Sequence, residues 1–305
     1  LEETPMAFRA QESLEELFQE LYDSQDVAVA EDIAKKILVL DPDNPEALFV
    51  LADGAEEYEA QAALLRRCVE ETKRRMAQAS PEEAESLEDL LFEAMRNLGW
   101  SLLLDEKAGE ALALAEEMLA FDGWDPSWGR GIRFGGLLAQ GKFAETLEES
   151  LKAESGDLFA AHARAVATLE LAGPGADAYR AVWDAFRVAP DLPFFVLEYW
   201  DAPEEEDEEF LDDYNGALFL QLYWTESEER IMVLSTATVF FGYLTDRLPD
   251  EVKEEVLANL RESSMFAELE RARVELRERF GPDGDVEQGD KEALKILAKM
   301  DLFVG

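Results

Sequence analysis

Side chains that could carry out chemistry gather in the stretch FDGWDPSWGRGIRF, residues 121–134. It combines two tryptophans, two aspartates and two arginines with three glycines. Paired carboxylates beside aromatic rings are the groups that a glycoside-cleaving site uses. In such a site Asp122 and Asp125 would act as acid and base, and Trp124 and Trp128 would form the platform for the sugar.

The same residues also fit a joint between two helices. Gly123 suits the end of one helix, Pro126 breaks the chain direction, and Ser127 is a good N-cap for the next helix. Trp124 and Trp128 would then pack as wedges between helix pairs. We favour the joint, because two carboxylates three residues apart do not readily flank a substrate. A helical-array enzyme acting on sugars stays as the alternative.

Other reactive residues are scarce. His162 is the only histidine and Cys68 the only cysteine, and both fall at positions where a packed core residue is expected. One histidine supports neither a catalytic triad nor a histidine-based metal site. The spacing of Asp283, Asp285 and Glu287 only partly matches a calcium loop. The sequence therefore predicts no enzyme activity, no metal and no cofactor.

The composition restricts the partners. The 305 residues carry a formal net charge of −42, which argues against nucleic acid and against an anionic membrane surface. The longest apolar run, residues 231–244, is shorter than the roughly 20 residues of a membrane-spanning helix. It predicts a mostly buried helix, with Thr225 and Glu228 as a capping box. A single cysteine suits a cytoplasmic protein, although the chain begins at Leu1 and a cleaved leader stays an alternative.

A repeat provides the main signal for the fold. In LDPDNPEAL, Pro42 cannot continue a helix, Asn44 is a good N-cap and Pro45 suits the first helical position. Three segments then share one spacing, in which an alanine on the second helix follows a Leu or Ala on the first helix by 13 residues. These three pairs are Leu17 with Ala30, Leu98 with Ala111, and Ala165 with Ala178. Small residues at a helix crossing let two backbones approach closely.

The apolar positions of each segment follow helical periodicity. The first segment has Leu14, Leu17, Phe18 and Leu21, then Ala30, Ala34 and Ile37, and Pro42 closes it. The third has Met95, Leu98, Gly99 and Leu102, then Ala111, Ala115 and Met118. The fifth has His162, Ala165, Val166 and Leu169, then Ala178, Val182, Ala185 and Pro190. The second and fourth segments fit this spacing loosely. The chain between them has more residues than the repeat needs, and we expect the extra residues to lengthen the helices around residues 66–91.

This pattern resembles the tetratricopeptide repeat (TPR). The resemblance implies an all-α fold, an α-α superhelix (TPR-like solenoid) over residues 1–200. Residues 201–305 are expected to form a helical C-terminal region packed on the array as a cap. The resemblance to the tetratricopeptide repeat also implies a non-catalytic protein-binding module that serves as an adaptor, scaffold or chaperone. A small-ligand sensor with a closed apolar pocket is a further alternative.

The resemblance also places a partner-binding groove on the first helix of each pair. Its candidate residues are Glu12, Glu15, Gln19, Glu46, Phe49, Asp53, Glu56, Glu93, Arg96 and Trp100. Most of them are acidic, and Phe49 and Trp100 could anchor an apolar side chain. The expected partner is therefore a protein or peptide that carries Lys or Arg beside a hydrophobic residue.

Overall fold

The computed structural model of the chain describes residues 5–121, 123–204, 208–260, 266–281 and 284–300. The side chains of residues 5–12, 208–209, 255–256 and 259–260 are not part of this description. Every regular element in the described part is an α-helix, and no strand occurs there. The prediction of an all-α fold is therefore confirmed.

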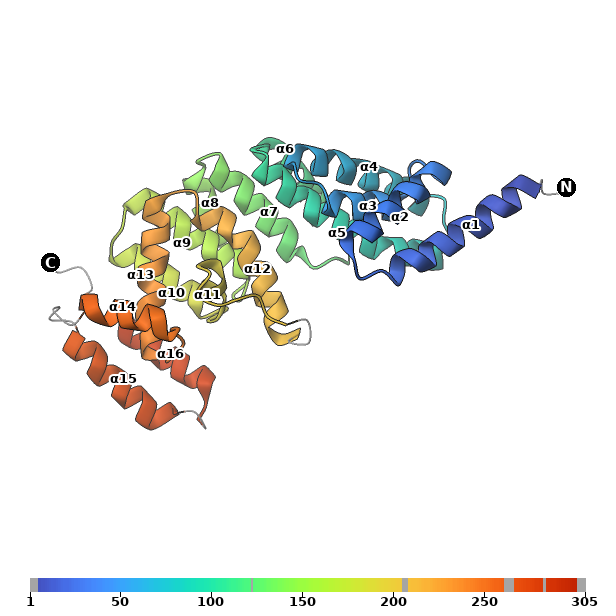
Figure 1. Cartoon of the computed structure of the whole chain (residues 1–305). Helices are drawn as coiled ribbons and strands as arrows, with labels where there is room; N and C mark the ends of the chain where they lie inside the picture. Colours follow the sequence, from blue (N-terminus) through green and yellow to red (C-terminus); the bar gives the residue numbers. More distant parts are fainter. Residues whose placement is uncertain (1–4, 122, 205–207, 261–265, 282–283, 301–305) are drawn as a thin grey trace. The chain divides into compact units, whose positions relative to one another are not determined.

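The helices group into two compact units, residues 1–136 and 137–305, and the division falls within α7. Unit 1 contains α1 (Pro5–Tyr22), α2 (Val27–Leu40), α3 (Pro45–Asp53), α4 (Tyr58–Met76), α5 (Pro81–Leu104), α6 (Ala108–Leu119) and most of α7 (Pro126–Ala139) (Figure 1). Each helix from α1 to α5 contacts the next one along the chain. A linear helical array requires such neighbour contacts, while the superhelix itself stays a prediction.

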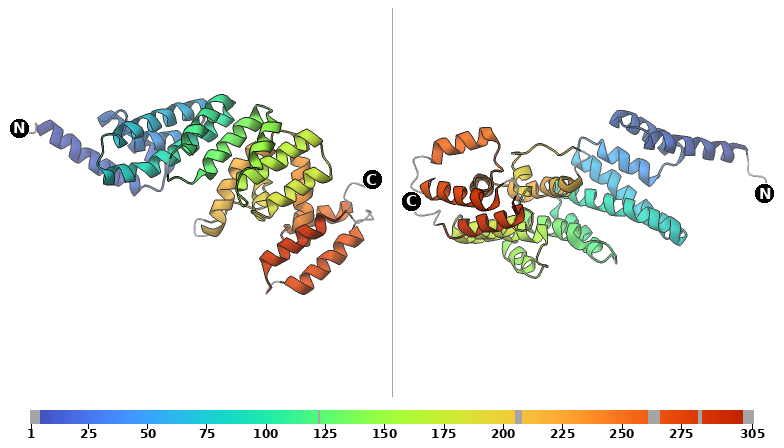
Figure 2. Two further views of the ribbon diagram at one scale, coloured as in Figure 1. Left: turned by 180° about the vertical axis from the view of Figure 1, so that it is seen from behind. Right: turned by 90° about the horizontal axis from the view of Figure 1, so that it is seen from below.

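Unit 2 contains α8 (Phe143–Ser150), α9 (Leu158–Ala172), α10 (Ala176–Phe186), α11 (Leu192–Val196), α12 (Glu208–Trp224), α13 (Glu228–Leu244), α14 (Asp250–Leu260), α15 (Phe266–Phe280) and α16 (Val286–Leu297). Helix α9 contacts α8, α10 and α12, and α13 contacts α10, α15 and α16. Helices α15 and α16 lie side by side (Figure 2). The predicted division near residue 200 falls inside unit 2, between α11 and α12, and stays a prediction.

The first predicted helix pair forms one apolar cluster. Leu21 of α1 is buried with Ile33, Ala34 and Ile37 of α2, and Ala47 of α3 joins them. The partly buried residues packed against this cluster are Leu14, Leu17, Phe18, Ala30, Leu38, Val50 and Leu51. The stripe predicted from the residue spacing is therefore the face on which α1 and α2 pack.

The connection between α2 and α3 has the predicted caps. Helix α2 ends at Leu40, and the Asn44 side chain accepts a hydrogen bond from the Ala47 backbone N–H at 3.1 Å. Pro45 occupies the first turn of α3, where its missing N–H costs nothing. The interpretation of this stretch as a helix stop followed by a helix start is confirmed.

The small residue of the third segment allows a close helix contact. A Cβ atom added to Gly99 of α5 would lie 2.3 Å from the terminal carbon of Ile132 on α7. The other predicted core residues of the third segment are also buried: Met95, Leu98, Leu102, Ala111, Ala115 and Met118. So are those of the fifth segment: His162, Ala165, Val166, Leu169, Ala178, Val182 and Ala185.

The surplus residues after the second segment lengthen two helices, as predicted. Helix α4 has 19 residues and α5 has 24. A capping box that the sequence reading missed starts α5. The Ser80 hydroxyl accepts from the Glu83 backbone N–H, and the Glu83 carboxylate accepts from the Ser80 backbone N–H at 2.8 Å.

The apolar run of residues 231–244 lies in α13 and is buried over most of its length. The predicted capping box at its start is wrong. Ser227, not Thr225, accepts the hydrogen bond from the Arg230 backbone N–H at 3.2 Å. Thr225 instead donates to the Gln221 carbonyl at the end of α12. In the described part of the chain, no helix is both long and apolar enough to cross a membrane.

Candidate functional site

The stretch of residues 121–134 connects α6 to α7. Helix α7 begins at Pro126, and Asp125 precedes it as the cap. The Asp125 carboxylate accepts from the Ser127 backbone N–H at 2.9 Å and from the Ser127 hydroxyl at 2.8 Å. The prediction that Ser127 caps this helix is therefore wrong, because the aspartate two residues earlier does so. Gly123 lies in the connection with φ +100°, beyond the end of α6 at Leu119.

The two tryptophans of this stretch are half-buried against α5. Trp124 stacks on Phe121 with ring centroids 4.1 Å apart and meets Phe92 edge-on at 5.1 Å. Its indole N–H donates to Glu88 at 2.9 Å. The guanidinium carbon of Arg96 lies 5.0 Å from the ring centroid of Trp128, a cation–π distance. Both rings therefore attach the α6–α7 segment to α5.

Of the two carboxylates of the suggested sugar site, the structure describes only Asp125. One oxygen of Asp125 accepts both bonds from Ser127. Asp122 lies outside the described residues. An acid–base pair across a bound sugar is thus a hypothesis without geometric support in the described part of the chain.

His162 lies in the core of unit 2. Its ring is fully buried, and its Nδ1 accepts a hydrogen bond from the indole N–H of Trp224 at 3.1 Å. Burial lowers the pKa of His162 to about 3. The imidazole is therefore neutral at physiological pH and has no contact with solvent.

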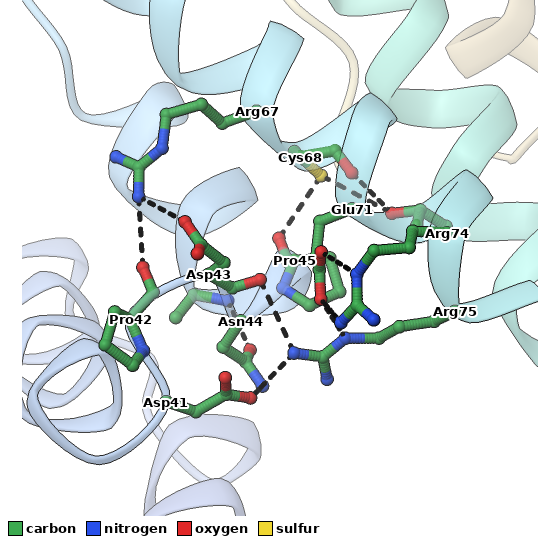
Figure 3. A network of polar contacts seen from close by, with 12 residues as sticks. Asp41, Pro42, Asp43, Asn44, Pro45, Arg67, Cys68, Glu71, Arg74 and Arg75 are labelled. Carbon is green, nitrogen blue, oxygen red and sulfur yellow. Dashed lines mark hydrogen bonds and ion pairs between the residues drawn. The ribbon is translucent and has the colours of Figure 1, made fainter.

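Cys68 is buried on α4, as predicted (Figure 3). Its thiol lies 3.2 Å from the Pro45 carbonyl oxygen, to which it donates. The pKa of Cys68 is raised to about 11, mainly because the thiol is buried. A thiol with so high a pKa is a poor nucleophile at neutral pH.

In the suggested calcium loop, the residues that the structure describes have other roles. Asp285 caps α16 by accepting from the Gln288 backbone N–H at 3.0 Å. Glu287 pairs with Lys291. Asp283 lies outside the described residues, and among the described ones no cluster of three or more potential ligands could hold a metal ion.

A polar network joins the α2–α3 connection to α4 (Figure 3). Arg67 donates to the Pro42 carbonyl at 3.0 Å and to the Asp43 carboxylate at 2.8 Å. Arg75 donates to Asp41 at 2.8 Å. These bonds hold the connection before α3 against α4.

Glu71 holds the end of this network together. It accepts from Arg74 at 2.7 Å and from Arg75 at 2.9 Å. The hydrogen bond from Arg74, helped by the one from Arg75, lowers the pKa of Glu71 to about 2. Glu71 is therefore ionised across the physiological range and neutralises part of the charge of α4.

The remaining bases of α4 face α6. Arg66 pairs with Glu110 at 2.6 Å, and Lys73 pairs with Glu117. The five bases of α4 are Arg66, Arg67, Lys73, Arg74 and Arg75, and each one has an acidic partner. Their charge is thus used on α6, on the α2–α3 connection and on Glu71 of α4 itself.

The helices that carry the predicted groove have almost no base. Helix α3 and residues 13–22 of α1 contain neither Lys nor Arg, and Arg96 is the only base of α5. Arg96 pairs with Glu93 at 2.5 Å. Glu15 and Asp53 are exposed, and neither makes an ion pair within the described residues. This face of the first helices therefore keeps an excess of negative charge.

The other groove candidates have varied surroundings. Gln19 is exposed and donates to Asp23 at 3.1 Å, and Glu46 accepts from the Tyr22 hydroxyl, which joins α3 to α1. Phe49 and Trp100 are half-buried.

One candidate does not lie where predicted, and the structure does not describe the side chain of another. Glu56 does not lie on the first helix of its pair, because α3 ends at Asp53 and the chain there already leads to α4. The side chain of Glu12 lies outside the described residues. That the remaining candidates share one groove stays a prediction.

Comparison with known proteins gives no relative for this chain: no family model, no curated protein and no solved structure matches it.

Proposed function

We propose that the chain is a non-catalytic protein-binding module, a TPR-like array used as an adaptor, scaffold or chaperone. Its partner is a protein segment with Lys or Arg beside a bulky apolar residue. The segment binds to the acidic face of α1, α3 and α5. Phe49 and Trp100 are the apolar anchors of this face.

The charge distribution within unit 1 carries the proposal. The bases of α4 neutralise α6 and the α2–α3 connection, so these parts have little charge left for a partner. The acids of α1 and α3 have no base on their own helices among residues 13–22 and 45–53. An unpaired acidic face attracts a basic partner by complementary charge.

The surroundings of the potentially reactive side chains favour a binding role over a catalytic one. Cys68 and His162 are buried, with their pKa values moved away from catalytic use. Asp125 caps a helix. Each of these residues has a structural role that explains its position.

A synthetic peptide tests the proposal. A fluorescein-labelled peptide of Lys, Leu and Ala, titrated with the full chain, is expected to bind at low salt. Binding should weaken steeply as salt rises, since the Debye length falls from about 10 Å at 0.1 M to about 3 Å at 1 M. Changing Glu15→Lys and Asp53→Lys together should weaken it by at least about tenfold.

A matched variant separates local contact from net charge. Glu70→Lys with Glu106→Lys changes the total charge by the same amount on exposed residues outside α1, α3 and α5. This control should bind the peptide nearly as well as the unmodified chain. The proposal fails if both double variants lose the same affinity, or if binding does not depend on salt.

A further inference from the structure

Unit 2 contains a surface cavity of about 450 Å³. It lies where the C-terminal end of α13, the first turn of α14, and α15 and α16 meet. The apolar part of its wall includes Leu244, Leu248, Leu276, Phe280 and Val286. Small-molecule sites measure about 300–1,000 Å³ and combine apolar walls with a few polar groups. The size and lining therefore suit a small ligand.

In the cavity wall, the guanidinium of Arg247 makes its hydrogen bonds to acids of the protein itself. Arg247 donates to both carboxylate oxygens of Asp290, at 2.5 and 3.0 Å, and to Asp191 at 2.6 Å. It thereby ties α16 and the start of α11 to the end of α13. Arg247 and Asp290 are consequently not available to a ligand.

A second carboxylate in the wall is shared by two bases. Asp246 accepts from Arg273 at 3.0 Å and lies 3.7 Å from the Lys253 ammonium. One negative charge thus faces two positive ones. The remaining acid of the wall is Asp250, at the first residue of α14.

Arg277 adds a further base to the same wall. Within the described residues it makes no ion pair, and no acid lies three or four positions away on its helix. These positions hold Arg273, Val274, Phe280 and Gly281. Like charges four residues apart destabilise a helix. Arg279, two residues further on, has an acid in reach and pairs with Glu275 at 3.7 Å.

Without the Arg247–Asp290 pair, the wall has one more base than acid. This local excess stands out in a chain whose net charge is −42. Arg277 is exposed and has no acidic partner among the described residues, so its guanidinium can reach a bound molecule. A ligand that is anionic at one end and apolar along its body matches this guanidinium and the apolar wall beside it.

We infer that this cavity binds a small amphiphilic anion, a carboxylate or phosphate group on a hydrocarbon body. Arg277 holds the anionic group, helped by the Arg273 and Lys253 side of the wall. Leu276 and Phe280 contact the body. The site is separate from the peptide-binding face proposed for unit 1 and does not depend on it.

Calorimetric titration of the full chain tests the inference with four eight-carbon probes: octanoate, octyl phosphate, 1-octanol and octylammonium. Octanoate or octyl phosphate is expected to bind with a Kd of about 1 mM or below. The tighter of the two identifies the preferred anionic group. The neutral and cationic probes should bind at least about tenfold more weakly.

Two single variants locate the binding. Arg277→Gln should weaken the anion by about tenfold, because a charged hydrogen bond is lost while no ion pair of the fold is broken. Arg279→Gln removes the same charge from the same helix outside the cavity and should leave the affinity within about twofold of the unmodified chain. The inference is overturned if neither anion binds, if octanol binds equally well, or if Arg277→Gln has no effect.

Discussion

At the scale of single residues, His162 makes the stability of unit 2 depend on pH. Its Nδ1 accepts from Trp224, while its Nε2 is buried and has no hydrogen-bond partner in the described structure. Such a ring is held neutral, because a charged imidazolium would lose its hydration without gaining a partner. The pKa of about 3 in the folded state is far below the ordinary value of about 6.5.

The sign of the effect follows from linkage. As the pH falls below about 6.5, the unfolded chain takes up a proton on this histidine before the folded chain does. The free energy of unfolding should therefore fall by about 1.4 kcal/mol per pH unit from this group, from about pH 6 towards pH 3. Above about pH 7 the contribution is constant.

The matched variant His162→Gln isolates this contribution. Glutamine keeps an acceptor for Trp224 but does not titrate. Urea unfolding of both proteins from pH 7 to pH 4 should give a difference in unfolding free energy that changes with this slope. Other groups, such as Asp213, whose pKa burial raises to about 6, are present in both proteins and cancel. Parallel pH profiles would mean that His162 has the same pKa in the folded and unfolded chains, which would contradict its burial as a neutral ring.

Cys68 gives a second prediction at this scale. Its thiol is buried and has a pKa of about 11, so almost no accessible thiolate exists at pH 8. A disulfide reagent such as dithionitrobenzoate should leave the native chain unmodified for hours and react with one thiol once urea unfolds it. Rapid labelling without denaturant would mean that the α3–α4 contact is open in solution.

At the scale of helices, Gly99 determines how closely α5 and α7 approach. An added Cβ would meet three carbons of Ile132 at 2.3 to 3.1 Å, so the side chain or a helix must move. We expect Gly99→Ala to lower the free energy of unfolding by about 1–3 kcal/mol, although alanine favours a helix. Thermal or urea unfolding measures this change.

Gly109 of α6 is the matched control. It is also helical, but a Cβ added there meets nothing within 4 Å. Gly109→Ala should therefore stabilise the chain slightly, by up to about 1 kcal/mol. If the two substitutions have the same effect, the α5–α7 contact is not as close as described.

Part of this architecture could be predicted from sequence because its causes are local. The apolar stripe that includes Leu17 and Ile37, and the stop and start at Asn44 and Pro45, depend on residues within a few positions of each other. The caps at Ser127 and Thr225 were misplaced for a related reason. At each place two capping residues lie two positions apart, Asp125 with Ser127 and Thr225 with Ser227. Spacing alone does not decide which one caps the helix.

Other features depend on residues far apart in the sequence. The Arg66–Glu110 pair spans 44 positions, and Arg247 meets Asp290 after 43. No local pattern indicates such partners, since they depend on how complete helices pack. The cavity beside Arg277 is of this kind, because its wall comes from four helices between residues 244 and 290.

At the scale of the whole molecule, the charge is uneven rather than uniformly acidic. The bases of α4 pair with acids of α4, α6 and the α2–α3 connection. Among the side chains that the structure describes, no acid of α1 or α3 makes an ion pair. Unit 2 instead has a local positive excess beside its cavity. The two proposals therefore concern ligands of opposite charge, one on each unit, and each can fail without the other.

The most direct measurement of the central claim is amide hydrogen exchange of the full chain with and without a bound basic, hydrophobic peptide. Exchange detects where a ligand protects the backbone or stabilises local structure. We predict that protection increases in residues 13–22 of α1, in α3 (residues 45–53) and in α5 (residues 81–104). Protection confined to α4 and α6, or to unit 2, would contradict it.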